Sequence, residues 1–404
     1  MDVEKALGVR LSPADRSFVA EWRDWVGSHL RQEHREVAGR GGPGDDDAWD
    51  VRLAWERDLA AGGWIGLGWP PAYGGRGATP AQEVLFAWEY AQSGAPARCT
   101  HFGENLLAPT LLAYGTPEQK SRFLPPIARA EELWCQGYSE PGAGSDLAAV
   151  RTSARIEDGR WTITGQKVWT TFAHHADWIF VLCRTEEGST GRRGLSYLLC
   201  PLDQPGVEVR PIRSLVGAAD FNEVFFDAAR TDADNAVGAT GDGWRVAMST
   251  LGHERGTSVL SYQFSFQREM AELLAEVRRR GRTGDPVLRR RLAGALVDLE
   301  VMRLTNLRTL ARLLRDGELG PEASGIKLYW SRWHQRFCEL ALDVLGADAT
   351  VVGSSYGEGD GYLPTGPVRS YLSSKSETIY AGTTEIQLNI VGERVLGLPR
   401  EPRP

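Results

Sequence analysis

The sequence of 404 residues contains no apolar run of the roughly 18 residues that a membrane-spanning helix needs, so we expect no membrane insertion. Its start, Met-Asp-Val-Glu-Lys, has no basic region followed by an apolar one, which argues against an export signal and for a cytoplasmic protein. A net charge of −7 argues against nucleic acid as the main partner. The five cysteines form no Cys-x-x-Cys pair, which favours free thiols in a reducing compartment.

Nucleotide-binding and metal-binding motifs are also missing. No Gly-x-Gly-x-x-Gly follows an expected strand and opens a helix, because the Gly-Ala-Gly at 142–144 and the Gly-Glu-Gly at 357–359 both stand in loop-like surroundings. A P-loop is absent, so a phosphate site would have to use side chains, loop amides or helix N-termini. His174 and His175 have no further ligand at metal spacing, and we predict no metal site from them.

The first third of the chain has the pattern of helices. Ser12, Thr79 and Thr116 each precede a proline at the expected first helical position. Gln82 and Gln119 stand at the third helical position after the two threonines, which completes a capping box in each case. Three helices are therefore expected to begin at these prolines.

From residue 134 the pattern changes to short β-rich runs separated by Gly, Pro, Asp or charged residues, which predicts antiparallel strands. Long helical patterns return after Gly243. This order predicts an α+β fold with an N-terminal helical domain at 1–133, a central antiparallel β domain at 134–240 and a C-terminal helical domain at 241–404. Strands are expected at 161–164, 178–183, 195–199, 207–209 and 223–226, and late helices at 287–314, 321–345 and 367–398.

Residues 134–171 carry the most informative pattern of the chain. The segment Gln-Gly-Tyr-Ser-Glu-Pro-Gly-Ala-Gly-Ser-Asp at 136–146 is rich in turn residues, and its small side chains leave backbone N–H groups and hydroxyls open to a ligand. The segment Gly-Gln-Lys-Val-Trp-Thr-Thr at 165–171 is a strand end with one aromatic and two hydroxyl side chains. Together they offer polar donors and a flat apolar wall, which suits an isoalloxazine ring.

These two segments resemble the signature segments of the acyl-CoA dehydrogenase flavoproteins, and Ile-Tyr-Ala-Gly-Thr-Thr-Glu-Ile-Gln at 379–387 resembles the C-terminal segment of that family. The resemblance implies FAD lying between the β domain and a C-terminal four-helix bundle. It implies oxidation of an acyl thioester, in lipid or secondary metabolism, to the α,β-enoyl thioester, with electrons passed to an electron-transfer flavoprotein. Ser145 would contact the pantetheine arm of the ligand. The implied FAD contacts are Tyr138, Ser139, Trp169, Thr171, Gly382, Thr383 and Glu385.

The reaction needs a carboxylate base in a water-poor pocket, because desolvation raises the pKa of the base toward neutrality. Many family members place this Glu directly after the tyrosine of the C-terminal segment, where this chain has Ala381. Glu254 is the candidate instead, since isovaleryl-CoA and long-chain dehydrogenases resemble this arrangement of a helix Glu with a small C-terminal residue. The N–H of Ala381 would polarise the thioester carbonyl. Arg255 resembles an arginine that supports the base or the ligand.

Two family patterns are altered. Much of the family has Arg-x-x-Phe and a downstream Gln that reach the FAD of a neighbouring subunit, whereas no Phe follows three residues after any arginine of 278–291. The family's Gln-x-x-Gly-Gly corresponds best to Asp-Val-Leu-Gly-Ala at 343–347. These departures concern the intersubunit half of FAD binding. A homodimer, a homotetramer and a heteromer in which a homologue completes the site all stay open.

Three interpretations follow. The first is an acyl-CoA dehydrogenase with Glu254 as its base, acting on a CoA or carrier-protein thioester whose acyl group the sequence does not specify. The second is a half-site or non-catalytic partner subunit of a heteromeric dehydrogenase, which the altered patterns favour. The third is an oxygen-using oxidase or flavin hydroxylase on the same fold. Glu254 argues against the hydroxylase, which needs no base aimed at the α carbon.

Overall fold

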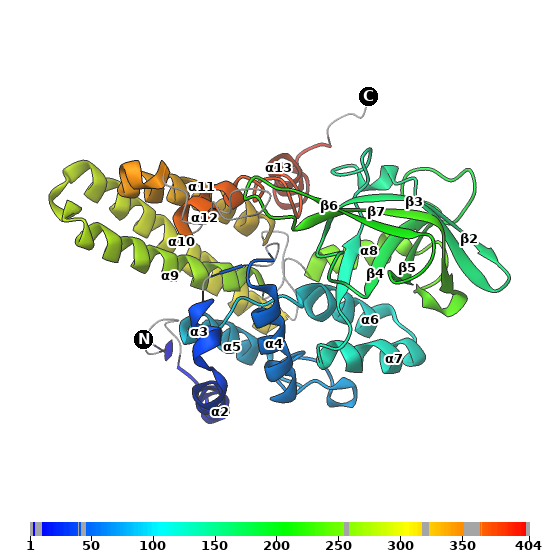
Figure 1. Ribbon diagram of the computed structural model, residues 1–404, viewed down its shortest axis with the longest axis horizontal. Coiled ribbons are helices and arrows are strands. Elements are labelled where there is room, and N and C mark those ends of the chain that lie inside the picture. The colour runs from blue at the N-terminus through cyan, green and yellow to red at the C-terminus, as the bar shows by residue number, and fades with distance from the viewer. Residues whose placement is uncertain are drawn as a thin grey trace, which may run out of the picture.

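The chain forms helices, then a sheet, then helices, so the predicted α+β class is confirmed. The computed structural model describes residues 3–4, 10–38, 40–41, 46–253, 258–316, 323–350, 364 and 366–400. Figure 1 shows the sheet and the C-terminal bundle side by side, with the N-terminal helices lying along both. None of the described helices combines the length and apolar composition that crossing a membrane requires.

The N-terminal helices begin where the capping residues predict. Ser12 caps the first long helix by accepting from a backbone N–H at 3.1 Å. The hydroxyls of Thr79 and Thr116 accept at 3.2 Å from the backbone N–H of Gln82 and Gln119. The side-chain oxygens of these glutamines accept in turn from the backbone N–H of the threonines, so both predicted capping boxes are confirmed. The elements are α2 (Pro13–His29), α3 (Gln32–Glu36), α4 (Trp49–Ala61), η1 (Pro71–Tyr73), α5 (Pro80–Ser93), η2 (Phe102–Leu107), α6 (Ala108–Tyr114) and α7 (Pro117–Ala128).

Strands of the described chain form one sheet in the order β6-β7-β3-β2-β4-β5-β8, with β1 added beside β4. All five predicted strands are present. The predicted antiparallel β domain is confirmed, and β1 and β2, which were not among the predicted strands, add parallel pairing with β4. Alternation of side chains shows which face a strand buries and says nothing about the direction of its neighbour. The strands are β1 (Trp134–Gly137), β2 (Ser153–Glu157), β3 (Arg160–Thr171), β4 (Trp178–Arg184), β5 (Leu195–Pro201), β6 (Val207–Ile212), β7 (Phe221–Asp232) and β8 (Ala236–Val237).

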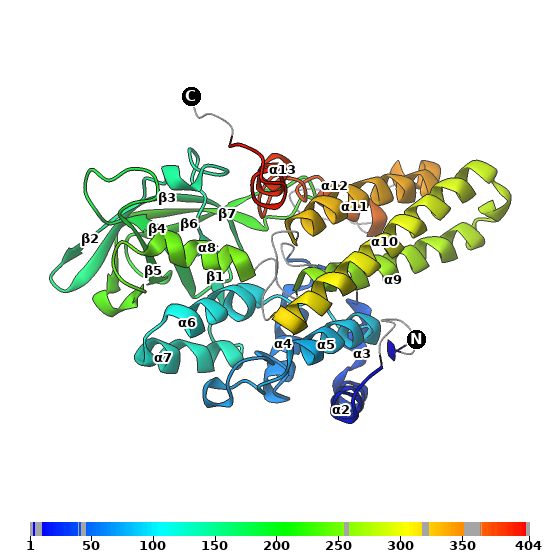
Figure 2. The same cartoon turned by 180° about the vertical axis from the view of Figure 1, so that it is seen from behind.

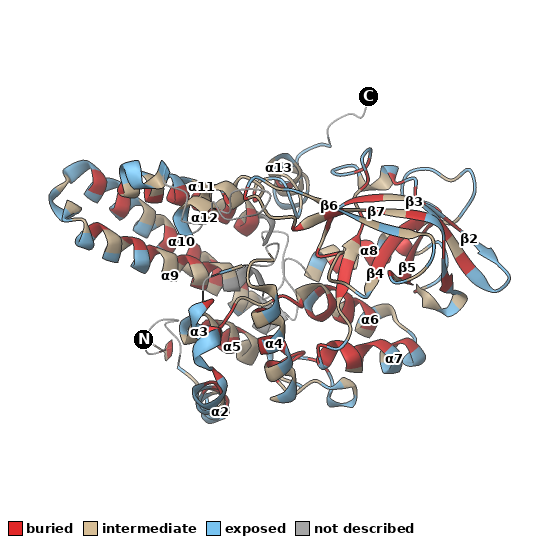
Figure 3. Ribbon diagram, viewed as in Figure 1, coloured by how far each residue is buried: buried red, intermediate tan, exposed pale blue. Residues whose placement is uncertain are grey.

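Helix α8 (Gly243–His253) covers one face of the sheet and contacts β4, β5, α6 and η2, as Figure 2 shows from behind. The later helices pack on one another and on α5, where the rings of Trp88 and Phe264 meet at 5.0 Å. Buried residues accordingly follow the sheet and the inner sides of the bundle helices (Figure 3). The bundle helices are α9 (Ser258–Arg279), α10 (Pro286–Asp316), α11 (Ala323–Leu345) and α12 (Gly366–Ser374).

The single helix predicted at 367–398 is wrong. The chain leaves α12 at Ser374 and begins α13 (Thr384–Ile390) only after a turn, followed by η7 (Val391–Val395). Gly382 in this turn has a φ of 88°, which a continuing right-handed helix does not allow. Thr383 then caps α13 by accepting from the N–H of Ile386 at 3.3 Å. Figure 1 places α13 between the bundle and the sheet.

Candidate functional site

A buried ion pair joins the two signature segments. Lys167 on β3 is fully buried, and its Nζ lies 2.7 Å from Oε1 of Glu140 in the first segment. The ammonium also donates to the carbonyl of Tyr138 at 3.1 Å, and the carboxylate accepts two backbone N–H groups. Burial opposes the charge of Glu140, but Lys167 holds the pKa of this carboxyl below its usual value. Ser139 accepts in turn from the N–H of Val168 at 2.9 Å, so the two segments are fixed as one unit.

Trp169 leaves the sheet at a β-bulge. The pairing of β3 with β7 slips between Lys167 and Thr170, and Trp169 has a φ of 59°, a left-handed torsion that bulky residues rarely adopt. Its side chain is 61% exposed and meets Phe221 edge-on at 6.2 Å. Because bulges re-aim side chains beside binding sites, the exposed indole is available as a flat wall for a ligand.

The other predicted contacts of these segments differ in exposure. Ser139 and Thr171 are half-buried, and Ser145 is exposed on the loop that follows β1. Tyr138 is 3% exposed and packs edge-on against Phe180 at 5.9 Å. Its ring therefore belongs to the core behind the site. Contact of these four residues with a ligand stays a prediction.

Side chains from α11 and α13 hold the turn that contains Ala381. This alanine has a φ of 51°, a conformation that costs on the order of 1 kcal/mol for a residue with a Cβ. Lys327 Nζ donates to the carbonyls of Glu377 at 2.6 Å and Gly382 at 3.0 Å, and Gln387 Nε2 donates to the carbonyl of Ala381 at 3.0 Å. Strained torsions persist only where the surroundings fix them, so these bonds set the direction of the exposed turn.

A histidine between two carboxylates supports the same segment. His334 on α11 lies with Nδ1 2.6 Å from Glu377 and Nε2 3.0 Å from Glu269 on α9. Burial disfavours a charged imidazole, yet the two carboxylates raise the pKa of His334 well above its usual value. The resulting charged cluster ties α9, α11 and the turn before α13 together.

Thr383 and Glu385 occupy the start of α13. The Thr383 hydroxyl caps the helix, and Glu385 is exposed in its first turn. Its own backbone N–H and the Thr383 hydroxyl lower the pKa of Glu385. Both side chains serve the helix end, and their contact with FAD stays a prediction.

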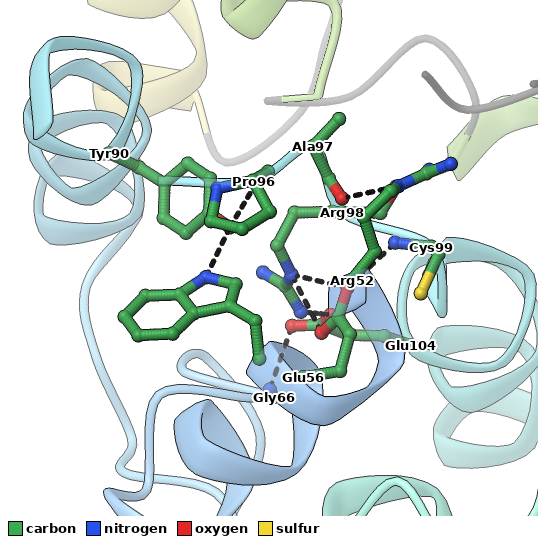
Figure 4. Close-up of polar contacts among 10 residues, drawn as sticks. Arg52, Glu56, Gly66, Tyr90, Pro96, Ala97, Arg98, Cys99 and Glu104 are labelled. Atoms are coloured by element: carbon green, nitrogen blue, oxygen red, sulfur yellow. Dashed lines mark hydrogen bonds and ion pairs between the residues drawn. The ribbon is translucent and has the colours of Figure 1, made fainter. Parts of the chain in front are cut away.

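A buried network of charges fixes the segment that leads into η2 (Figure 4). Arg98 donates from Nε to both oxygens of Glu56, at 2.9 and 2.8 Å, and from a terminal nitrogen to Glu104. Glu56 also accepts from the N–H of Cys99 at 2.7 Å, and Glu104 accepts from the N–H of Gly66 at 2.9 Å. Ion pairs that are buried and fully hydrogen-bonded hold their surroundings in one arrangement.

Several buried polar atoms near these elements have no hydrogen-bond partner within the described part of the chain, among them Thr100 Oγ1, His101 Nδ1, Gln136 Oε1 and Thr170 Oγ1. Burial, above all, lowers the pKa of His101 to about 3, so its imidazole is neutral at neutral pH. Buried polar atoms seldom lack a partner, so these groups are available to a bound molecule. Gln136 and Thr170 lie within the two signature segments but were not identified as candidate contacts, and no motif marks Thr100 or His101.

The predicted base, Glu254, and Arg255 lie outside the described residues. Helix α8, which leads to them, is anchored by the hydroxyls of Thr250 and Thr110 at 2.9 Å. It ends at His253, whose buried Nε2 meets no hydrogen-bonding group of the described chain. Helix α8 as a whole lies against η2 and the sheet.

A basic pocket of about 520 Å³ lies between the loop before β5 and the C-terminal end of the described chain. Guanidinium groups bind phosphate oxygens through paired, charge-assisted hydrogen bonds. Ala148, one of its lining residues, lies three residues after Ser145, so the pocket adjoins the first signature segment. It is lined by Ala148, Thr190, Gly191, Arg192, Arg193, Glu393, Arg394 and Arg400.

The residues present fit a flavin. Trp169 presents an exposed flat ring, and Ile379 and Tyr380 in the C-terminal segment are 64% and 41% exposed. A Cβ added at Gly142 or Gly144 would meet no atom within 4 Å, so the first signature loop leaves room for another molecule. The half-buried hydroxyls of Ser139 and Thr171 supply hydrogen-bonding groups that a ring with polar edges requires.

Three family models match the chain in order: acyl-CoA dehydrogenase N-terminal domain at 12–131, middle domain at 135–229 and C-terminal domain at 241–396. Acyl-CoA dehydrogenase IpdE1 of Mycobacterium tuberculosis is 50% identical over 387 residues, which cover 96% of this chain and 98% of that protein. A chain of the Tcur3481-Tcur3483 steroid ACAD superposes with a TM-score of 0.84 at 29% identity, covering 97% and 99% of the two chains. The ChsE4-ChsE5 complex from Mycobacterium tuberculosis gives a TM-score of 0.79 at 29% identity and covers 99% and 100%. The resemblance of the signature segments is thus confirmed, and the chain belongs to the acyl-CoA dehydrogenase family of flavoproteins.

Proposed function

We propose that this acyl-CoA dehydrogenase oxidises an acyl-CoA to the α,β-enoyl-CoA with FAD as its cofactor. The observation that carries the proposal is the exposed Trp169, which a strained bulge turns out of the sheet beside the fixed Glu140–Lys167 unit. Bound FAD would supply the acceptor for the hydride of the β carbon. Trp169 would cover one face of the flavin ring, and the hydroxyls of Ser139 and Thr171 would bind its polar edge.

The chain's own residues supply the proton chemistry. We propose that Glu254, the residue that follows α8 in the sequence, removes the α proton. The N–H of Ala381 donates to the thioester carbonyl and so stabilises the charge that develops on this oxygen. The bonds from Lys327 and Gln387 support this role because they hold the turn in place before the substrate arrives.

The basic pocket favours a CoA ester over a carrier-protein ester. Four arginines line it close to Ser145, the predicted pantetheine contact, and a nucleotide carrying several phosphates matches that charge. We expect Arg192→Ala together with Arg193→Ala to raise KM for an acyl-CoA. The same pair of changes leaves kcat for an acyl-pantetheine unchanged, because that substrate lacks the nucleotide.

The acyl group is proposed to be bulky and to carry hydroxyl or carbonyl groups. Thr100, His101 and Gln136 offer buried polar atoms to a bound molecule, which a saturated hydrocarbon chain would leave unsatisfied. A structural relative is named a steroid ACAD, and a steroid-derived acyl group has this character. Faster flavin reduction by a straight-chain acyl-CoA than by a hydroxylated polycyclic one would contradict this assignment.

We propose that the chain works as part of a heteromer and passes electrons to an electron-transfer flavoprotein. One structural relative is a complex of two different chains, ChsE4 and ChsE5. Helix α10 exposes several apolar side chains along its length, as an interface with another chain would require. They are Val287, Leu296, Val297, Val301 and Leu304.

The decisive experiment is anaerobic bleaching of the bound flavin by a panel of acyl thioesters. Glu254→Gln should retain FAD and abolish the bleaching, whereas Glu272→Gln, an exposed carboxylate on α9, should bleach like the wild type. Unchanged bleaching in Glu254→Gln would refute the base. A protein that gains flavin only on mixing with a homologue would favour the half-site alternative, and peroxide formed during turnover would favour an oxidase.

A further inference from the structure

We propose that Asp46, His174 and His175 form a binding site for a divalent metal ion of the zinc class. Asp46 stands just before α4, and the two histidines follow β3, so the site joins parts of the chain that are distant in sequence. One ligand atom from each residue lies within 4.8 Å of the other two. The Nε2 atoms of His174 and His175 are 3.5 and 4.0 Å from Oδ2 of Asp46.

These separations suit a shared ion better than a direct hydrogen bond. A strong hydrogen bond of this kind spans about 2.7–3.2 Å. Zinc binds imidazole nitrogen and carboxylate oxygen at about 2.0–2.1 Å, so neighbouring ligands of a tetrahedral ion lie roughly 3.3–3.5 Å apart. The Asp46–His174 pair already has this spacing, and the Asp46–His175 pair exceeds it by about half an ångström.

The surroundings orient the ligands as they do in metal sites. Nδ1 of His174 lies 3.1 Å from Oδ1 of Asn222, whose amide also donates to the carbonyl of Thr170 at 2.9 Å. A metal-binding imidazole commonly uses one nitrogen for the ion and the other for such a partner. The ring of His175 stacks on Trp49 at a centroid distance of 4.0 Å and an angle of 6°. Both rings are therefore held with Nε2 toward Asp46.

Charge and access also favour a cation. The three side chains are 24%, 21% and 27% exposed, so an ion can reach them and still lose part of its water. The N–H of Asp46 donates at 3.2 Å to Asp220, which adds a second, buried carboxylate behind the first. The negative charge of Asp50 favours a positive charge at His175, whereas the positive charge of Arg52 disfavours it. Two imidazoles and one carboxylate leave a fourth position for water, as zinc sites with three protein ligands do.

The ion would fasten the segment before α4 to the connection after β3. His174 lies three residues beyond Thr171, so the bound metal steadies the strand end that carries the predicted flavin contacts. The metal site itself does not depend on the proposed oxidation. Its test can therefore fail or succeed independently of the flavin assignment.

The test is equilibrium dialysis of the purified holoprotein against Zn²⁺, followed by removal of free metal and elemental analysis. We expect about one zinc per chain in the wild type and in His29→Gln, a control at an exposed histidine on α2. His174→Gln and Asp46→Asn should lose this zinc. Asn222→Ala should bind it about 10–100-fold more weakly, because it removes an orienting partner.

Thermal unfolding gives a second measurement, in which the wild-type protein alone already tests zinc binding. Excess Zn²⁺ should raise the unfolding temperature of the wild type and of His29→Gln, since a ligand that binds the folded state stabilises it. It should not raise that of Asp46→Asn. Wild-type protein that retains no zinc and shows no shift would overturn the proposal, as would a His174→Gln, His175→Gln double variant that retains as much as the wild type.

Discussion

Trp169 owes its exposure to one backbone torsion. Along β3 the odd-numbered residues Trp161, Ile163 and Lys167 are buried, and strict alternation would bury Trp169 with them. The bulge between Lys167 and Thr170 reverses this alternation, so the indole of Trp169 points outward. A strained torsion on a bulky residue commonly marks a functional position, and here it places the proposed ligand wall outside the core.

Trp169→Ala is expected to weaken flavin binding without weakening the fold. An exposed indole adds little to stability, so the free energy of unfolding should change by no more than about 0.5 kcal/mol. Loss of a ring that stacks on another is worth about 0.5–1.5 kcal/mol, so the FAD dissociation constant should rise about 2–12-fold. Trp161→Ala, at a buried indole on the same strand, should instead lose about 3–5 kcal/mol of stability. Equal destabilisation by the two changes would contradict the assignment.

Lys327→Met tests whether the turn at Ala381 is positioned by its neighbours. The change removes the donor from two carbonyls, at Glu377 and Gly382, and should cost about 1–3 kcal/mol. If the turn holds the thioester carbonyl, the rate constant of flavin reduction should fall about 5–150-fold while KM changes little. Lys375→Met, at a partly exposed lysine after α12, is the control and should react at the wild-type rate. A drop in stability with an unchanged reduction rate would show a purely structural role.

The capping boxes of α5 and α7 have the same residues, but only the one on α7 also binds the sheet. In both, a Gln returns a bond to the threonine that starts the helix. Among the described residues the side chain of Gln82 makes only this bond, whereas Gln119 also donates to the carbonyls of Asp234 at 2.7 Å and Ala236 at 2.8 Å, which lie at the edge of the sheet. The box on α7 therefore fastens a helix to β8 as well as capping it.

Gln119→Ala is expected to cost more than Gln82→Ala. Loss of the capping contact alone should cost about 0.5–1 kcal/mol in each variant. Gln119→Ala also leaves two carbonyls without their donor, which should add about 1–3 kcal/mol. Urea unfolding of the two variants measures the difference. Equal midpoints would mean that water replaces the lost donor at β8.

Local chemistry predicted most elements of this fold. A Ser or Thr directly before a proline predicted where helices begin, and the spacing of apolar residues predicted the remaining helices and the five strands. Both signals are local, because capping and side-chain alternation act within a few residues. The break at 375–383 was missed because Gly382 and Thr383 were taken as helix interior, although a glycine followed by threonine can end one helix and cap the next. Strands β1 and β2 were also missed, and with them the parallel pairing, since the direction of pairing depends on the partner strand.

Contacts between distant segments were the part that the sequence could not predict. Asp46 meets His174 and His175, and Arg98 meets Glu56, only because separate helices and strands pack side by side. The signature segments were recognised individually, while the Glu140–Lys167 bond that unites them became visible only in three dimensions. The sequence therefore identified the candidate flavin contacts and missed the groups that hold them in place.

Stability of the whole protein should depend on pH through Glu83, which lies on α5. Burial, and then the nearby Glu104, raise the pKa of Glu83 to about 7. Between its ordinary value near 4.5 and this raised value, the folded state holds the proton that the unfolded chain releases. The free energy of unfolding contributed by Glu83 must therefore fall as pH rises through this window and stay constant above it.

Glu83→Gln should remove this dependence, because the amide stays neutral at every pH. Relative to the variant, the wild type should lose on the order of 2 kcal/mol between pH 5 and 8, since one pKa unit is worth about 1.4 kcal/mol and partial exposure reduces the full effect. Urea unfolding at intervals across this range measures the difference. Glu118→Gln is the control, since the pKa of this exposed carboxylate on α7 is lowered, so its contribution changes only below pH 5. Parallel profiles for the wild type and Glu83→Gln would mean that Glu83 is ionised in the folded protein.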